Sequence, residues 1–133
     1  MKKNIVLILS IILLQSCYFG AGLIEEELPG SFMLFANNSI EELSIINNSN
    51  NKSIYNIVVD EAVFAVGFNK EYIIAKSYSV NKNLILYHII EVEKELNQIN
   101  LNLSFQDYKL KRESLKLPYD LNFTLVYHEI AKN

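Results

Sequence analysis

Residues 62–78 read AVFAVGFNKEYIIAKSY and decide the fold class of this chain. In residues 62–68 the apolar side chains fall on both alternating faces, which is the pattern of a central strand covered on two sides. Residues 71–78 form a second strand-like run, and Asn69-Lys70 between them suits a tight turn because asparagine tolerates a positive φ. We therefore predict an antiparallel hairpin at the centre of a sheet.

Strand-like patterns flank this hairpin on both sides. The predicted strands are residues 31–37, 42–47 and 54–59 before it, and 84–91 and 121–128 after it. The polar stretch 47–53 is rich in turn formers and predicts an exposed loop. Residues 91–99 have apolar positions at helical spacing, yet they could equally extend the strand before them.

A helix is predicted late in the chain. Ser104-Phe105-Gln106-Asp107 is a capping-box pattern, in which a serine hydroxyl and an acid serve the free amides of a first turn. Phe105, Tyr108 and Leu115 then share one helix face, and Pro118 ends the helix after Leu117. The predicted fold is α+β, with a mostly antiparallel sheet of about six to seven strands and one or two short helices late in the chain.

The N-terminal stretch has the pattern of a secretory signal. Lys2 and Lys3 precede residues 5–14, an uncharged run that is apolar except for Ser10. As a helix this run would reach about 15 Å, half of the hydrocarbon core of about 30 Å, so a stable membrane span is not expected.

The end of this run, Leu14-Gln15-Ser16-Cys17, resembles the lipobox of bacterial lipoproteins. That resemblance implies a signal peptide at residues 1–16 and acylation of Cys17. The turn signal Pro29-Gly30 then predicts a tether at 17–28 and one strand-rich domain at 29–133. The alternative is an ordinary secretory signal in which Cys17 is incidental. A lipoprotein carries two or three acyl chains, so the predicted protein is anchored to a membrane of the bacterial cell envelope, facing the periplasm or the surface.

Charge and composition exclude several classes of protein. The chain of 133 residues has 12 basic and 15 acidic side chains, and loss of residues 1–16 would remove two lysines and no acid, which gives a mature charge of -5. An acidic chain with one arginine lacks the basic stripe that nucleic-acid binding requires. One cysteine excludes an internal disulfide framework and leaves no zinc-finger spacing. The acid run 25–27 is interpreted as a solvated spacer, with a surface-export tag as the alternative.

Scattered pieces between residues 28 and 118 also resemble a family of short bacterial lipoproteins of unknown function. These pieces are Leu28-Pro29-Gly30-Ser31-Phe32, Gly67-Phe68-Asn69, Tyr72-Ile73-Ile74-Ala75-Lys76, Tyr87-His88-Ile89-Ile90, and the late Phe105, Arg112 and Leu117-Pro118. The resemblance implies a lipid-anchored, strand-rich domain, and it brings no activity and no catalytic residue.

Candidates for chemistry are few. His88 and His128 are the only two histidines, each in a predicted strand and near an acid, so neighbouring strands would let them bind a metal in a metal-dependent envelope hydrolase. A Ser-His-Asp site has no Gly-x-Ser-x-Gly elbow to support it. Asp60 and Glu61 could serve as paired carboxylates, but adjacent strand residues point to opposite faces.

The eight tyrosines suggest a binding face. Tyr72, Ile74, Lys76 and Tyr78 alternate on one face of a predicted strand, and aromatic side chains commonly anchor interfaces. Strand propensity with partly buried rings explains the same residues without a ligand. We assign Tyr72, Lys76 and Tyr78 to ligand or partner binding.

The expected function is that of a non-enzymatic binding, structural or accessory module of the envelope, without a cofactor or a bound metal. Its expected partners are the membrane, through the lipid on Cys17, and an envelope protein. The alternatives are a periplasmic immunity or inhibitor lipoprotein, and the hydrolase using His88 and His128.

Overall fold

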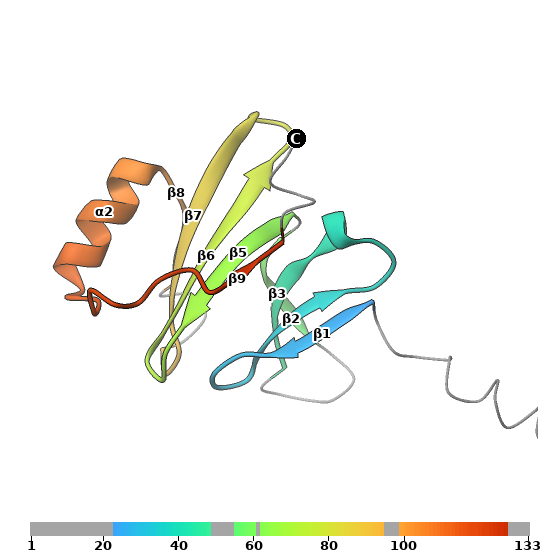
Figure 1. The fold of residues 1–133 in the computed structure, drawn as a ribbon, viewed down its shortest axis with the longest axis horizontal. Coiled ribbons are helices and arrows are strands. Elements are labelled where there is room, and N and C mark those ends of the chain that lie inside the picture. Colours follow the sequence, from blue (N-terminus) through green and yellow to red (C-terminus); the bar gives the residue numbers. More distant parts are fainter. Residues whose placement is uncertain (1–22, 49–54, 61, 95–98, 128–133) are drawn as a thin grey trace, which may run out of the picture.

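The computed structural model describes residues 23–48, 55–60, 62–94 and 99–127. Within them the chain forms two antiparallel sheets (Figure 1). The four-stranded sheet has the order β1 (Ile24–Glu27), β2 (Phe32–Ala36), β3 (Ser44–Asn47) and β4 (Asn56–Val59). The five-stranded sheet has the order β8 (Asn100–Leu103), β7 (Leu84–Glu91), β6 (Tyr72–Ser79), β5 (Val63–Phe68) and β9 (Leu125–Val126). One α-helix, α2 (Phe105–Ser114), and one 3-10 turn, η1 (Ile40–Glu42), complete the described elements, so the predicted α+β class is confirmed.

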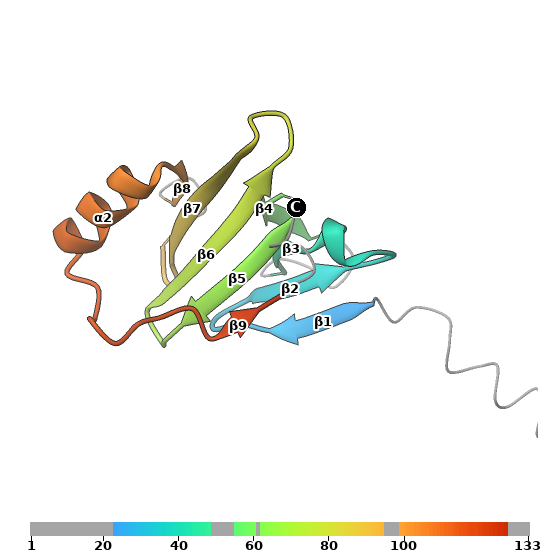
Figure 2. The same ribbon diagram turned by 45° about the horizontal axis from the view of Figure 1, so that its top comes forward.

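The five-stranded sheet is the middle of three layers. The four-stranded sheet lies on one face and α2 on the other, as the two views in Figures 1 and 2 agree. A larger core cluster fills the space between the sheets, and a smaller cluster lies under the helix. Successive β6 residues divide between them: Ile73 and Ala75 enter the larger cluster and Ile74 the smaller. Strand β5 lies between β6 and β9 and is buried from Val63 to Gly67, which confirms the prediction of a central strand covered on two sides.

The predicted hairpin between β5 and β6 is confirmed, with Phe68 opposite Ile73. The prediction of this turn relied on a positive φ at Asn69, and Asn69 does not have one. Instead the Asn69 side-chain oxygen accepts the backbone amides of Glu71 at 2.9 Å and Tyr72 at 2.8 Å. The asparagine therefore stabilises the turn by capping it.

Helix α2 begins as predicted and ends earlier. The Ser104 hydroxyl accepts the Asp107 amide at 3.1 Å, and Tyr108 is buried against the sheet. At the other end Lys116 has a φ of 54°, and the Leu117 amide donates to the Arg112 carbonyl at 3.0 Å. Such a bond across a left-handed residue closes a helix. The left-handed conformation of Lys116 therefore terminates the helix, upstream of Pro118.

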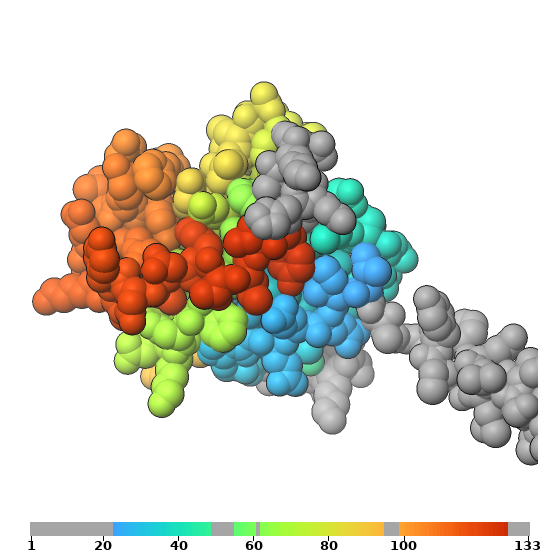
Figure 3. Space-filling model, in the orientation of Figure 1, coloured from blue at the N-terminus to red at the C-terminus, as the bar shows by residue number. Residues whose placement is uncertain are grey.

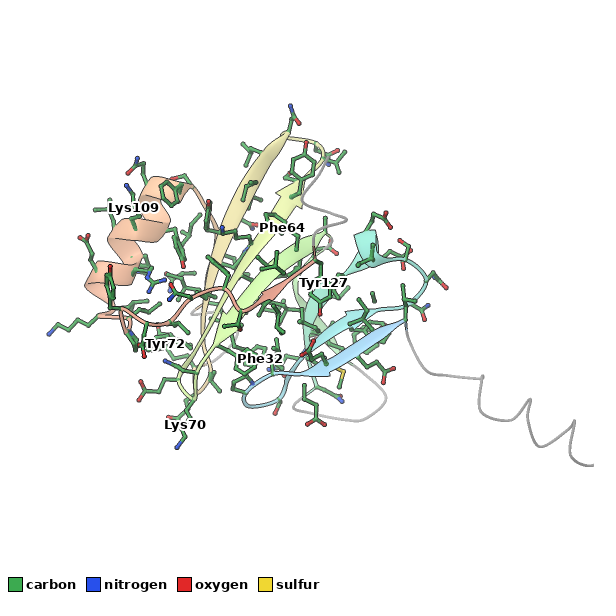
Figure 4. All side chains as sticks on the ribbon, viewed as in Figure 1. Phe32, Phe64, Lys70, Tyr72, Lys109 and Tyr127 are labelled. Carbon is green, nitrogen blue, oxygen red and sulfur yellow. The ribbon has the colours of Figure 1, made fainter. Side chains whose placement is uncertain are left out.

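Three predicted boundaries differ from the structure. Residues 24–27, predicted as tether, form β1, in which Glu26 faces inward and accepts a hydrogen bond of 3.0 Å from the Tyr127 hydroxyl at the junction of the two sheets (Figure 4). Strand β7 ends at Glu91 and the chain turns at Val92, while β8 at residues 100–103 was not predicted. The long strand predicted at 121–128 is reduced to β9.

The C-terminal segment packs very closely on β5 at Gly67. The segment that includes Asn122 and Phe123 crosses β5 so closely that a Cβ on Gly67 would lie 1.9 Å from the Asn122 carbonyl oxygen. Hydrogen bonds from Thr124 to Val66 and from Tyr127 to Phe64 then hold the segment on β5. Figure 3 shows this C-terminal segment (red) between α2 and the four-stranded sheet.

Substitution Gly67→Ala tests this contact. The added methyl collides with backbone rather than with a movable side chain, so we expect the free energy of unfolding to fall by about 3 kcal/mol. Denaturant unfolding followed by circular dichroism measures the change. The matched control is Thr124→Ala on the same segment, an exposed position where a change within about 0.5 kcal/mol is expected. Equal stability of Gly67→Ala and the wild type would contradict the close crossing.

Candidate functional site

The structure does not bring Tyr72, Lys76 and Tyr78 into one binding face. Tyr72 packs against the smaller cluster under α2, whereas Tyr78 packs against the larger cluster between the sheets. Each tyrosine borders a different hollow. Tyr72 borders one of about 360 Å³ whose other lining residues are Glu71, Glu91, Glu93 and Lys94. The predicted face is therefore divided along the strand.

Lys76 serves the packing of the helix layer. Its ammonium lies 4.4 Å from the centre of the Phe123 ring and 5.6 Å from that of Tyr87. The Tyr87 ring in turn contacts Tyr108 with centroids 4.9 Å apart, and burial raises the pKa of Tyr87. This cation and its aromatic neighbours tie β6 and β7 to α2 and the C-terminal segment.

Tyr78 borders the largest of the described hollows, a cleft of about 640 Å³. We call this hollow the cleft; its lining residues are Glu41, Val58, Val59, Asp60, Ala62, Ser77, Tyr78, Ser79, Val80, Asn81, Leu86 and Asn102. The cleft lies between the two sheets, because β4 supplies one wall and β6, β7 and β8 supply the other. A volume of this size is typical of ligand sites.

Two carboxylates give the cleft a negative charge. Glu41 and Asp60 are both exposed side chains, and the described residues that line the cleft include no lysine, arginine or histidine. A hydrogen bond with the Ser39 side chain, followed by one with its own backbone amide, lowers the pKa of Glu41. Glu41 is thus ionised at neutral pH and the cleft is acidic.

A buried polar pair lies behind the cleft wall. His88 is 2% exposed, and its Nε2 lies 2.8 Å from the hydroxyl of Ser77, itself a lining residue. On the other side of the ring, the backbone amide of Asn102 donates to Nδ1 at 3.2 Å. Desolvation by burial lowers the pKa of His88 to about 4, so the ring is neutral at pH 7.

These contacts assign the proton of the imidazole. Because Nδ1 accepts the Asn102 amide, the single proton of the neutral ring is on Nε2 and is donated to the Ser77 oxygen. A base that activates a serine must instead accept the serine proton at that nitrogen. The pair therefore has the wrong tautomer for nucleophilic catalysis, and the Ser77 hydroxyl keeps its own proton to donate elsewhere.

Of the predicted histidine pair, His88 lies within the described residues. His88 lies on β7, and strands β6 and β5 separate β7 from β9. His128 and Glu61 lie outside the described residues, as does Cys17. Among the residues that are described, no three histidine, cysteine or acidic side chains come together as metal ligands.

Sequence reasoning missed most of the cleft. Ser77, Asn102 and Glu41 were not singled out. The sequence signals were Asp60, an acid at the end of a predicted strand, and Tyr78 on the predicted tyrosine face. The other lining residues could not be predicted, because the cleft depends on how the two sheets stack.

No helix in the described part of the chain combines the length and apolar character needed to cross a membrane. Residues 29–129 match the family described as "Protein of unknown function (DUF3997)", and the chain belongs to this family. No curated protein and no solved structure matches the chain.

The buried neutral state of His88 predicts an acid-sensitive fold. The pKa of this histidine is 6.5 in the unfolded chain and about 4 in the folded protein, so between these values protons bind mainly to the unfolded state. The contribution of the neutral His88 ring to the free energy of unfolding should be fully present above pH 6.5. It should fall by on the order of 3 kcal/mol as the pH drops to 4.

Urea unfolding at several pH values, compared between wild type and His88→Asn, measures this effect. The asparagine oxygen can still accept the Asn102 amide but does not titrate, so its slope between pH 6.5 and 5 should be clearly smaller. Glu113→Gln, at an exposed position of α2, is the control and should keep the wild-type slope. Parallel slopes for wild type and His88→Asn would show that the buried ring is not the source.

Proposed function

We propose that this protein is a lipid-anchored module of the bacterial cell envelope that acts by binding and not by catalysis. The observation that carries the proposal is the N-terminal sequence: Lys2 and Lys3, a short apolar run, and a small residue directly before Cys17. Acylation of Cys17 would make that residue the mature N-terminus and the attachment point to the membrane.

The start of β1 sets how far the domain stands from that anchor. Strand β1 begins at Ile24, so six residues separate it from Cys17. Fully extended, six residues span at most about 20 Å. An anchored domain would therefore stay close to the bilayer, and its acidic charge would hold it off an anionic surface.

Two features of the described residues support binding over catalysis. The cleft offers about 640 Å³ between the sheets with both apolar and polar lining residues. The one serine–histidine pair beside it has a tautomer that leaves the serine unactivated. We assign the binding role to the cleft. Of the predicted binding residues Tyr72, Lys76 and Tyr78, Tyr78 is the one that lines it.

A second candidate is an immunity or inhibitor lipoprotein. The acidic lining by Glu41 and Asp60 favours it, because a charged surface steers and selects a partner of opposite charge. This candidate shares the anchor and the cleft with the first and differs in the kind of partner.

Mass spectrometry of the membrane fraction tests the anchor. Wild-type cells should yield a mature chain that begins at an acylated Cys17, and Cys17→Ala should lose both the lipid and the new N-terminus. Ser16→Ala is a suitable control, since alanine keeps a small residue before the cysteine and should be processed normally. An unacylated wild-type chain in the soluble fraction would overturn the lipoprotein proposal while leaving the cleft untouched.

A further inference from the structure

The cleft has apolar walls. Its apolar lining residues are Val58, Val59, Ala62, Val80 and Leu86, which come from both sheets and from the β6–β7 turn. Val59 and Ala62 are buried, so this apolar surface begins in the core and continues outward to Val80, which is 75% exposed. A guest in the cleft would therefore bury an apolar stem.

The charges of the cleft are of one sign. Among the lining residues that the structure describes, the charged ones are Glu41 and Asp60, and the described ion pair, between Lys94 and Glu91, lies elsewhere. Asp60 forms no hydrogen bond or ion pair within the described part of the chain. The two carboxylates are left to attract a cation from outside.

Ser77 adds a hydrogen-bond donor at the base. Its oxygen accepts the His88 proton, so its own hydroxyl hydrogen is available to a guest, although the side chain is only 3% exposed. A buried donor of this kind favours an acceptor on the guest, such as a peptide carbonyl. The base of the cleft thus adds polar selectivity to the apolar walls.

We propose that the cleft binds an organic cation on an apolar stem, namely an arginine or lysine side chain presented by a protein partner. The aliphatic part of such a side chain packs on Val58 and Val80 while its charge meets Glu41 and Asp60. The inference rests on the binding role proposed above and is independent of the lipid anchor.

The rim of the cleft favours a polypeptide over a small free cation. Val80 is 75% exposed at the protruding end of the β6–β7 hairpin (Figure 1). Leu84, which shares one face of β7 with the lining residue Leu86, is 42% exposed there. These two apolar side chains extend the binding surface beyond the volume that a small amine fills, and a partner that inserts one basic side chain can cover them as well.

The test is an NMR titration of the full chain in nonionic detergent. The probes are butylguanidinium and pentylamine, with pentanoate and pentanol as anionic and neutral controls of similar length. We expect the two cations to bind in the millimolar range and to shift the amide signals of residues 79–81 and 62, and we expect pentanoate to leave them unchanged.

Charge variants identify the groups responsible. The double variant Glu41→Gln/Asp60→Asn should bind the cations about fivefold more weakly, as expected for two partly solvated charge contacts. Glu113→Gln/Asp120→Asn removes the same charge outside the cleft and should bind as the wild type does. All four positions are exposed, so a dispersed spectrum of each variant shows that the fold is retained.

A capped Val-Arg-Val tripeptide then separates the two sources of the cation. Binding at least tenfold tighter than butylguanidinium supports a polypeptide partner, and equal or weaker binding shows that the cleft takes a free small cation instead. Equal binding of pentanoate and the cations, or unchanged cation affinity in the cleft variant, overturns the charge assignment. An absence of shifts with every probe overturns the cleft as a site, whatever the state of Cys17.

Discussion

Strands β5, β6 and β7 are apolar on both faces, and each face must be removed from water. The four-stranded sheet covers one face, while α2 and the C-terminal segment together cover the other. This double covering fixes the order of the layers. It also requires the last segment to lie directly on β5, which is possible because Gly67 has no side chain at the crossing point.

A bulge in β8 connects that covering to the cleft. Tyr87 pairs with Leu103 and Ile89 with Asn100, so β8 has one more residue than β7 over the same span. Asn102 takes a φ of 56°, Leu101 packs into the larger cluster and Leu103 into the smaller. At the bulge, the Asn102 amide donates a hydrogen bond to Nδ1 of His88. One packing requirement thereby sets the tautomer of the histidine and the donor role of Ser77.

Periodicity predicted the parts of the fold that depend on local pattern. Residues 62–68 show the two-faced cover of β5 in the sequence itself, alternation predicted the strands at 71–78 and 84–91, and the Ser104 capping box marks the start of α2. Strand β1 was hidden because three consecutive glutamates disfavour a strand, and its place is set by pairing with β2 and by the Tyr127–Glu26 bond across 101 residues. The cleft could not be predicted from local pattern either, because the stacking of the two sheets brings Asp60 and Asn102 together.

The acidic side chains differ in the contacts that they make within the fold, and this difference bears on the cleft. Glu26 holds the two sheets together, and its neighbourhood raises the pKa of Tyr127 to about 12, chiefly through burial and then through the carboxylate itself. Glu42 accepts the Asn38 amide beside η1, and Glu41 is tied to Ser39. Asp60 has no such contact in the described part of the chain, although it lies beside the buried Val59. Glu26, Glu42 and Glu41 each have a contact within the fold, whereas the proposed cation site is the contact that we assign to Asp60.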